Sequence, residues 1–292
     1  MPELPEVETV RRGLESTLVG ATITGVSVRE RRLRWPIPDE FESQVTNRKI
    51  VRIERRSKYL LFRLEALQAT SPTGPNSAPG TLLGHLGMTG SFIAHDAKVT
   101  PDYRTHDHVE FQLARPGSSQ ALTVLRYNDP RRFGSMHFFE GEDLDQPLLA
   151  HLGPEPLTDA FTGRYLYKQT RRRTGPIKQA LMDNTLVVGV GNIYANESLF
   201  RAGIHPARAA NRISLARYER LVSEVKTVLA EAIAAGGSTL KDFVNAAGEP
   251  GYFQLDYFVY GRDGELCKAC GNPLKPLRQG GRATVFCGFC QR

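Results

Sequence analysis

Four cysteines near the C-terminus have the residue type and the spacing of a metal site. They form two Cys-x-x-Cys pairs, Cys267 with Cys270 and Cys287 with Cys290. Each pair can present two thiolates to one ion, and four soft ligands complete the tetrahedron that zinc prefers. Two disulfides are the alternative, but the chain is expected to be intracellular, where disulfides are rare. The spacing therefore predicts one structural Zn²⁺, because four thiolates leave no open position for a substrate.

The cysteine segment is also basic. The chain has a net charge of +7 and a pI of about 9.3, a balance compatible with nucleic acid, anionic lipid, acidic proteins or plain solubility. No acidic residue occurs from 267 to 292, and Arg278 and Arg282 flank Gly280 and Gly281. A zinc hairpin with a basic, glycine-flexible tip suits a phosphate backbone better than a protein groove. A second basic concentration contains Lys168, Arg171, Arg172, Arg173 and Lys178, and for the arginine triplet alone a solvated face is the favoured interpretation.

Pro2 could act as a nucleophile once Met1 is removed. It would then carry a free secondary amine, and an α-amino group titrates near ~8, so a useful fraction is neutral at physiological pH. A neutral secondary amine can attack a sugar C1′, displace a base and leave a cationic iminium. That cation acidifies the 2′ hydrogen, which makes elimination of the 3′ phosphate and then the 5′ phosphate feasible. Without other evidence, a proline at this position more often belongs to a short mobile tail.

The first half of the chain predicts a β-rich domain. Residues 5–18 carry apolar side chains at helical spacing, which predicts a short amphipathic helix. Strand-like segments follow, and two sheets packed as a sandwich are the expected arrangement. These segments span residues 21–28, 50–64, 109–113 and 121–127, with a hairpin turn at 115–119 and a surface loop at 66–80.

The second half is predicted to be helical, so that the fold class is α+β. Ser214 can cap a helix whose apolar stripe runs from Leu215 to Leu229 and that ends at Gly236 and Gly237. After residue 253 the pattern becomes strand-like again and ends in the cysteine segment. The predicted domains are residues 1–150, which are β-rich, residues 151–262, which are helical, and residues 263–292, which form a zinc β-hairpin.

The sequence argues against a membrane-spanning protein and against a secreted one. No apolar run is long enough to cross a bilayer. The N-terminus opens with acidic residues and lacks the basic and then apolar sequence of a secretory signal. We therefore expect a cytoplasmic protein without a membrane partner.

Short motifs occur in a fixed order along the chain, ahead of the four-cysteine tail. They are Met-Pro-Glu-Leu-Pro-Glu-Val-Glu-Thr-Val-Arg-Arg-Gly at 1–13, Ser-Lys-Tyr-Leu-Leu at 57–61, His-Leu-Gly-Met-Thr-Gly at 85–90, His-Asp-His-Val at 106–109, Asn-Asp-Pro-Arg-Arg-Phe-Gly at 128–134, His-Leu-Gly-Pro-Glu-Pro-Leu at 151–157, Leu-Met-Asp at 181–183 and Val-Gly-Val-Gly-Asn-Ile-Tyr-Ala at 188–195. The ordered set resembles bacterial formamidopyrimidine-DNA glycosylase from end to end. Residues 4–9 are similar to this purine-directed branch rather than to the sister family, endonuclease VIII.

The resemblance implies a bifunctional glycosylase and AP lyase of base excision repair. Such an enzyme excises 8-oxoguanine and formamidopyrimidines from duplex DNA and then performs β,δ-elimination. The resemblance assigns the nucleophile to Pro2 and the acid/base work at the sugar to Glu3. Lys58 corresponds to the lysine that contacts phosphate beside the lesion and assists β-elimination. Arg282 corresponds to the zinc-hairpin arginine that binds phosphate and serves δ-elimination.

The resemblance also implies how the gap in the duplex is filled. A base inside a duplex is shielded, so the enzyme must extrude the nucleotide and stabilise the gap. That role falls on Met88, Arg131 and Phe133. An apolar wedge and a planar aromatic suit a vacated stack, and Arg131 can hydrogen-bond the orphaned cytosine.

Contacts to the phosphate backbone are implied for a further set of residues. Asn192 opens a helix of the helix–two-turn–helix element, and its amide and the helix N-terminus bind phosphate. His106 and Lys178 match other backbone-contacting positions, and Arg173 is a candidate in a loosely aligned region. Residues 238–254 match the mobile loop that closes over the flipped purine.

Two alternatives stay open at this point. One is an endonuclease VIII-like enzyme that acts on oxidised pyrimidines, and the other is a non-catalytic DNA-binding protein on the same scaffold. The second would need a defective centre, yet Pro2, Glu3, Lys58, Asn192 and Arg282 are all present. The implied partner is double-stranded DNA with oxidised purines or abasic sites. The chain is expected to act as a monomer on the bacterial nucleoid, since one molecule supplies every part of the site.

Overall fold

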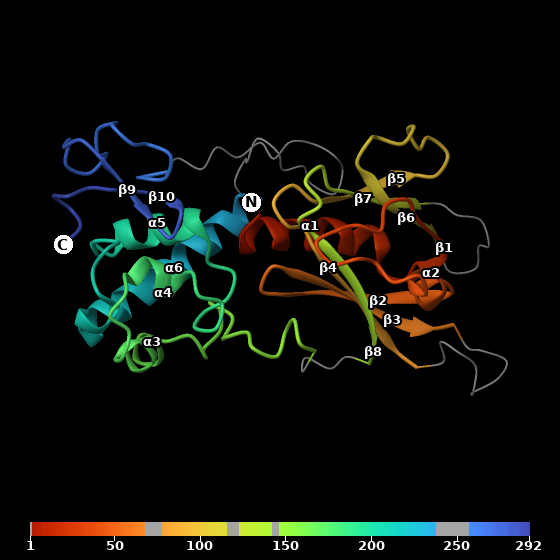
Figure 1. The fold of residues 1–292 in the computed structure, drawn as a ribbon, viewed down its shortest axis with the longest axis horizontal. Helices are drawn as coiled ribbons and strands as arrows, with labels where there is room; N and C mark the ends of the chain where they lie inside the picture. Colours follow the sequence, from red (N-terminus) through yellow and green to blue (C-terminus); the bar gives the residue numbers. More distant parts are fainter. Residues whose placement is uncertain (1, 68–77, 116–122, 142–145, 238–256) are drawn as a thin grey trace. The chain divides into compact units, whose positions relative to one another are not determined.

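The computed structural model describes residues 2–67, 78–115, 123–141, 146–237 and 257–292. They belong to two compact units, the first built mainly from Glu6–Gln146 and the second from Glu3–Pro5, Pro147–Ala235 and the residues after 256 (Figure 1). Within these ranges no helix is long and apolar enough to cross a membrane. Most of the predicted loop at 66–80, most of the turn at 115–119 and all of the 238–254 loop lie outside the described residues.

The described part of the first unit is organised around one antiparallel sheet of eight strands in the order β5-β7-β6-β1-β2-β3-β4-β8. The strands are β1 (Thr22–Val28), β2 (Arg48–Arg56), β3 (Tyr59–Ala66), β4 (Gly80–His85), β5 (Ser91–Asp96), β6 (Asp107–Ala114), β7 (Thr123–Asn128) and β8 (Ser135–Glu140).

Aromatic contacts show that this sheet folds back on itself. Phe62 on β3 and Phe92 on β5 are far apart in the strand order, yet their ring centroids are 5.6 Å apart. Phe92 also packs against Tyr127 on β7, with ring centroids 5.0 Å apart. Strands that do not pair therefore share one core, as in the predicted β-sandwich.

Helix α1 (Leu4–Leu18) covers this core. Val7, Val10, Leu14 and Leu18 lie three or four residues apart along the helix, and each is at most 1% exposed. Burying side chains of this size contributes about 1.5–3 kcal/mol each before chain entropy is counted. The helix predicted at residues 5–18 is confirmed. A short helix, α2 (Phe41–Val45), adds Phe41 and Val45 to the same core.

The strand-like pattern at residues 50–64 is not one strand but a hairpin. Strands β2 and β3 pair antiparallel up to Arg56 opposite Tyr59, so that Ser57 and Lys58 form a two-residue turn. Ser57 has a φ of 57°, a positive value that glycine or asparagine usually supplies in such turns. The sequence has no glycine or asparagine at this turn. The alternating pattern of residues 50–64 therefore gave no indication that two strands are present.

The described part of the second unit is mainly helical up to Ala235, which confirms the α+β class. Its helices are α3 (Gly163–Thr170), α4 (Ile177–Leu181), α5 (Asn192–Arg201), the 3₁₀ helix η1 (Ala210–Arg212) and α6 (Leu215–Ala234). Ser214 is the N-cap residue of α6, as predicted, but its hydroxyl accepts no hydrogen bond from the first turn. The predicted apolar stripe of α6 is buried, from Tyr218 through Leu229.

A two-stranded hairpin follows, made of β9 (Lys275–Gln279) and β10 (Arg282–Phe286). The prediction of strand directly after residue 253 is wrong for the described residues 257–274, which form turns and one isolated bridge between Leu266 and Pro273. Aromatic and β-branched residues in this stretch pack into a small core around the cysteines instead of pairing in a sheet.

Candidate active site and nucleic-acid interface

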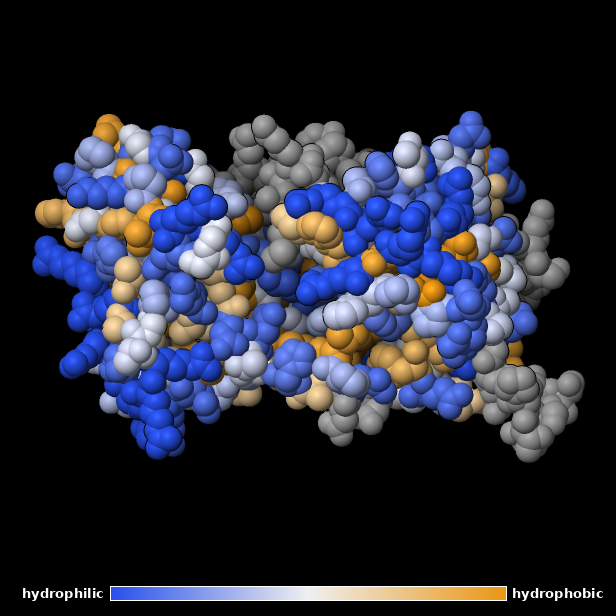
Figure 2. All heavy atoms as spheres, viewed as in Figure 1, coloured by the Kyte–Doolittle hydropathy of each residue, from blue (hydrophilic) through white to orange (hydrophobic). Residues whose placement is uncertain are grey.

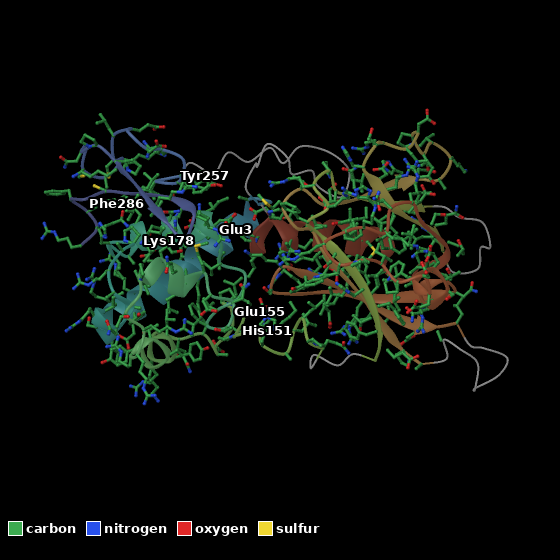
Figure 3. The ribbon with its side chains drawn as sticks, viewed as in Figure 1. Glu3, His151, Glu155, Lys178, Tyr257 and Phe286 are labelled. Atoms are coloured by element: carbon green, nitrogen blue, oxygen red, sulfur yellow. The ribbon has the colours of Figure 1, made fainter. Side chains whose placement is uncertain are left out.

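Glu3 is bound by backbone N–H groups at the start of helix α5. Its carboxylate accepts from Gly191 at 2.9 Å, from Ile193 at 2.9 Å and from Tyr194 at 3.4 Å, and the residue is 2% exposed. The first N–H groups of a helix have no partner inside the helix, and its positive end favours a negative charge. Glu3 therefore caps α5 from the other end of the sequence, and the helix in turn fixes its carboxylate. Figure 3 labels Glu3 and Lys178 in this unit.

Two glycines make the close approach of the N-terminal segment possible. Gly189 has a φ of 77°, and its carbonyl accepts from the backbone N–H of Leu4 at 3.1 Å. A Cβ at Gly191 would lie 2.2 Å from Cδ of Glu3, well inside van der Waals contact. The sequence pointed to this glycine-rich motif but not to its contact with Glu3.

Lys178 and Asn192 meet at strand β10. The ammonium of Lys178 donates to Thr284 Oγ1 at 2.6 Å and to the carbonyl of Ala283 at 3.1 Å. The side-chain amide of Asn192 donates to the same carbonyl at 3.1 Å. Arg282 is the preceding residue and is exposed. The structure thus brings together three of the predicted residues, Lys178, Asn192 and Arg282.

Lys178 is unusual for a lysine because it is 1% exposed. Burial lowers its pKa to about 8, the charge of Arg282 acts in the same direction, and the carboxylate of Glu3 opposes both. Its buried ammonium holds the hairpin to α4, a role that its sequence position alone does not reveal.

The four cysteines converge on one point in the hairpin region. Their sulfur atoms all lie within 4.8 Å of one another, with Sγ distances of 4.0 Å between Cys267 and Cys290 and 3.5 Å between Cys270 and Cys287. A tetrahedral zinc ion with bonds of about 2.3 Å requires sulfurs about 3.8 Å apart. None of the four forms a disulfide. The donor set and its dimensions therefore fit one zinc ion.

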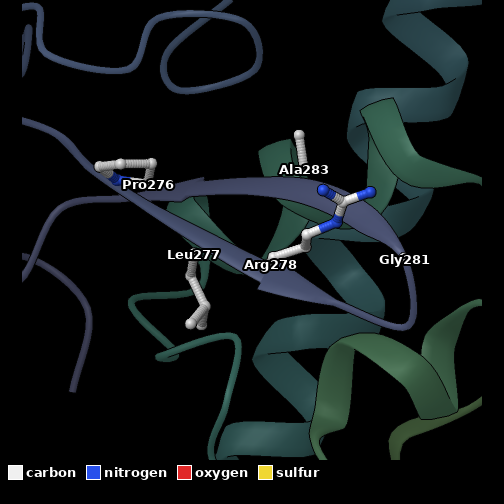
Figure 4. A pocket seen from close by; sticks show the side chains of 5 residues that line it. All are labelled: Pro276, Leu277, Arg278, Gly281 and Ala283. Carbon is white, nitrogen blue, oxygen red and sulfur yellow. The ribbon is translucent and has the colours of Figure 1, made fainter.

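The hairpin carries an open pocket (Figure 4). It is lined by Pro276, Leu277, Arg278, Gly281 and Ala283. Arg278 on β9 pairs with Ala283 on β10. The strand pair thus combines a concave apolar surface with two exposed arginines, Arg278 and Arg282.

In the first unit, Lys58 lies in the turn between β2 and β3 and is half-buried. Its charge acts on His85, whose pKa is lowered to about 4 chiefly by burial and then by Lys58. The His85 imidazole is therefore neutral at neutral pH, and its Nδ1 accepts the backbone N–H of Gly87 at 3.1 Å. This bond shapes the turn that carries Met88.

Asp129 joins the two turns that carry the predicted gap-filling residues. It is fully buried, and its carboxylate accepts from the Thr89 hydroxyl at 2.7 Å and from the backbone N–H of Gly134 at 2.8 Å. A Cβ at Gly87 would lie 2.4 Å from the backbone of Phe133 and Gly134, so the turns touch. The sequence analysis assigned no role to Asp129, although it lies in the motif at 128–134. Its acidic side chain directly before Pro-Arg-Arg was the one feature of the sequence that could have drawn attention to it.

Met88, Arg131 and Phe133 lie together on these turns. Phe133 is 44% exposed, and the Arg131 guanidinium lies 4.6 Å from its ring centroid. Met88 is half-buried. Phe133 therefore projects from the surface, and Met88 does so only in part.

The remaining predicted residues have less specific surroundings. His106 is half-exposed, and its carbonyl accepts the backbone N–H of Asp129 at 3.0 Å. Arg173 forms an ion pair with Asp183 at 2.6 Å.

Pro2 is buried, and Met1 lies outside the described residues. The first unit carries Pro2, Lys58, Met88, His106, Arg131 and Phe133, and the second carries Glu3, Arg173, Lys178, Asn192, Arg282 and the cysteines.

Glu197 is a buried carboxylate that sequence reasoning missed. It lies on α5 and accepts three consecutive backbone N–H groups, from Phe258 at 2.8 Å, Val259 at 2.9 Å and Tyr260 at 2.8 Å. Burial raises the pKa of Tyr260, and the charge of Glu3 acts in the same direction. Glu197 lies in the run Ala-Asn-Glu-Ser-Leu-Phe at 195–200, which is buried throughout. A single acidic residue in this run is the sequence feature that could have pointed to its role.

Three family models match the chain in order. Residues 1–136 match the formamidopyrimidine-DNA glycosylase N-terminal domain, residues 152–244 match the formamidopyrimidine-DNA glycosylase H2TH domain, and residues 264–292 match a zinc finger found in FPG and IleRS. With the cysteine geometry, the last match confirms the prediction of one structural zinc ion.

Full-length relatives and solved structures agree with these matches. The formamidopyrimidine-DNA glycosylases of Pseudomonas aeruginosa (strain LESB58) and Stutzerimonas stutzeri (strain A1501) are 52% and 51% identical to the chain over 292 residues, with 100% of each protein covered. The crystal structure of MutM (FPG) from Thermus thermophilus is 38% identical, covers 99% of this chain and 98% of its own, and has a TM-score of 0.82. A complex between Lactococcus lactis Fpg and DNA with an abasic site is 32% identical, covers 99% of both chains and has a TM-score of 0.85.

Proposed function

The chain belongs to the formamidopyrimidine-DNA glycosylase family, and on that premise we propose that it excises oxidised purines from duplex DNA and then cleaves the strand as an AP lyase. The substrates are 8-oxoguanine and formamidopyrimidines. The proposal rests on Glu3, which directly follows Pro2 in the chain. Three backbone N–H groups fix the position of its carboxylate. A catalytic acid needs such a fixed position relative to its nucleophile.

Base excision begins at the amine of Pro2 after Met1 has been removed. The nitrogen lone pair attacks C1′ of the damaged nucleotide, and the base leaves with the electron pair of its glycosidic bond. Once the N–C1′ bond has formed, the proton of the Pro2 nitrogen passes to the Glu3 carboxylate. Glu3 then gives that proton to the ring oxygen as the C1′–O4′ bond breaks, which leaves an iminium between Pro2 and the open sugar.

Strand cleavage follows from the charge of that iminium. It acidifies the 2′ hydrogen, and once that proton is removed the 3′ phosphate departs with its bonding electrons. A second elimination releases the 5′ phosphate. Lys58 is proposed to bind the phosphate at the first step and Arg282 at the second, since each cation stabilises charge on the departing group.

Binding of the duplex is proposed to involve both units. Met88, Arg131 and Phe133 fill the gap left by the extruded nucleotide. The phosphate backbone is proposed to contact His106, Arg173, Lys178 and Asn192. Cys267, Cys270, Cys287 and Cys290 hold the zinc ion, which contributes folding energy to the hairpin and no step of the reaction.

Figure 2 colours the side chains of each unit by hydropathy, and hydrophilic side chains are frequent on the surface that it draws. The proposed domains are a catalytic domain at 1–150, a helix–two-turn–helix domain at 151–262 and the zinc hairpin at 263–292. The enzyme is proposed to act as a monomer on DNA of the bacterial nucleoid.

Borohydride trapping tests the proposed function. The protein is mixed with a duplex that contains one 8-oxoguanine opposite cytosine, and the adduct is located by mass mapping. We expect a covalent product on Pro2, because borohydride reduces the iminium to a stable amine. An N-terminal extension that blocks the Pro2 amine should remove the product, while the same extension at the C-terminus should not.

Two other outcomes would overturn parts of the proposal. Preferential excision of thymine glycol opposite adenine would favour the endonuclease VIII-like alternative. A zinc-loaded protein that binds the duplex but gives no adduct would favour a non-catalytic DNA-binding protein.

DNA affinity is expected to fall as the pH rises through about 8, because Lys178 loses its proton there. A phosphate near Lys178 and Arg282 raises the pKa of Lys178, so the bound state holds more protons than the free state above that pH. Binding is then linked to proton uptake, and affinity decreases with rising pH. The check is a set of dissociation constants from about pH 7 to about pH 9, measured on a duplex with an abasic-site analogue.

Two variants isolate the contribution of Lys178 from that of the Pro2 amine. Lys178→Met cannot be protonated and Lys178→Arg does not lose its proton in this range, so both should flatten the pH dependence. Equal pH profiles for the parent and both variants would contradict the expectation.

A further inference from the structure

A loop that follows β1 carries several arginines, and most have a partner within the protein. Arg29 lies 4.0 Å from the ring centroid of Tyr103. Arg31 pairs with Glu42 at 2.6 Å. The guanidinium of Arg32 donates twice to the carboxylate of Glu30, at 2.8 Å and 2.7 Å. These side chains are already committed to neighbours in the fold.

Arg34 differs from its neighbours in this loop. It is exposed, and no carboxylate of the described residues lies within ion-pair distance of it. Its guanidinium lies 5.8 Å from the ring centroid of Trp35, which is 47% exposed and is the only tryptophan in the chain. An arginine above an exposed indole, without an anionic neighbour, keeps its five donors available to an external anion.

The backbone of Arg34 ties it to the gap-filling turn. Its N–H donates to the carbonyl of Gly134 at 3.1 Å, directly after Phe133. The loop therefore has a fixed position relative to Phe133 and Arg131.

The charge of Arg34 also acts on the residues around Lys58. Burial raises the pKa of Tyr59 and the charge of Arg34 opposes this. At His85, burial, Lys58 and Arg34 all lower the pKa. Arg34 and Lys58 thus act on the same imidazole from two different loops, which places two cations in one neighbourhood of the first unit.

We propose that Arg34 is a further phosphate-binding residue for the DNA duplex, held over Trp35 and fixed to the gap-filling turn by its backbone. The inference rests on the proposed function, because the ligand is the same duplex. A phosphate needs a cation that is exposed, fixed in position and not neutralised by a carboxylate, and Arg34 meets all three conditions. Arg32 would first have to leave Glu30.

The test compares Arg34→Ala with the matched variant Arg32→Ala. Affinity is measured at several salt concentrations on a duplex with a non-cleavable abasic-site analogue, and on an undamaged duplex. Arg34→Ala should weaken binding about tenfold at low salt, the order that a charge-assisted hydrogen bond contributes. The slope of log affinity against log salt should also become shallower by about 1. Arg32→Ala should change neither quantity appreciably.

The undamaged duplex should show the same loss, since a phosphate contact carries no lesion specificity. Alanine keeps the backbone N–H that bonds Gly134, so the turn remains anchored. If Arg34→Ala is nonetheless poorly folded, Arg34→Gln, which keeps a planar polar end without the charge, gives the same comparison.

Two results can be told apart. A parent protein that excises 8-oxoguanine while Arg34→Ala keeps the parental salt slope would overturn the assignment of Arg34 alone. A parent protein that neither binds nor excises would overturn the proposed function itself. An equal effect of Arg32→Ala would also reject the assignment, because it would reflect net charge instead of a specific contact.

Discussion

Replacing Gly191 by alanine is expected to reduce single-turnover excision of 8-oxoguanine by about 100-fold or more, the cost of a misplacement of about 1 Å at a reacting group. The added Cβ would lie 2.2 Å from Cδ of Glu3 and 2.4 Å from its Oε1. The backbone of Gly191 has φ −108° and ψ −157°, an extended conformation that alanine adopts without strain. The carboxylate of Glu3 must therefore move, while the helix itself is not strained.

A second glycine of the same unit provides the control. At Gly175 a Cβ would meet only Oε1 of Gln179, at 4.0 Å, so Gly175→Ala should retain the parental rate. Zinc content and affinity for an abasic-site analogue are measured on both variants, to separate loss of chemistry from loss of fold. A parental excision rate in Gly191→Ala would mean that the position of the Glu3 carboxylate does not control the reaction.

Removal of zinc is expected to lower DNA affinity by at least about 100-fold, because the metal supplies the folding energy of the hairpin. The small core around β9 and β10 contains Phe200, Val259, Cys267, Leu274, Val285 and Cys287, so two of its members are themselves metal ligands. Without the ion nothing links the two Cys-x-x-Cys pairs, and Arg278 and Arg282 lose their positions. The eight-stranded sheet contains none of these residues and should keep its fold.

The measurement combines a chelator, metal quantification and a binding titration. Fluorescence of Trp35, the only tryptophan, reports on the first unit during the same titration. Affinity should return when zinc is restored. Unchanged affinity after verified metal loss would contradict the expectation, and a large change in Trp35 fluorescence would show that the effect is not confined to the hairpin.

Local patterns predicted α1, α6, the strands β1, β6 and β7, the β2–β3 segment and the cysteine hairpin, but not β4, β5, β8 or the helices α2, α3 and α4. The apolar spacing in α1 and α6 determines which helix face is buried, and the cysteine spacing determines the metal site. The turn at Ser57 was missed because its positive φ is adopted by a residue that rarely signals a turn. Local sequence has no means of marking such a turn when the tertiary structure imposes it.

The candidate site was predictable only as a set of residues and not as a set of contacts. Glu3 bonds Gly191, 188 residues away, and no local pattern encodes that pairing. Lys178 was assigned from the resemblance to phosphate contact, but its burial against β10 depends on how α4 packs on the hairpin. Asp129 and Glu197 escaped notice because a buried carboxylate is recognisable only once the backbone donors around it are known.

The three amides that converge on Glu197 have a consequence for local stability. Residues 258–260 have no regular secondary structure, yet each donates its N–H to a carboxylate on the buried face of α5. An irregular segment usually opens in small local fluctuations at little cost in free energy. Here all three bonds end on one side chain, so this short stretch cannot open one residue at a time. It opens as a block or together with α5, and its amide hydrogens share the slow exchange of a helix.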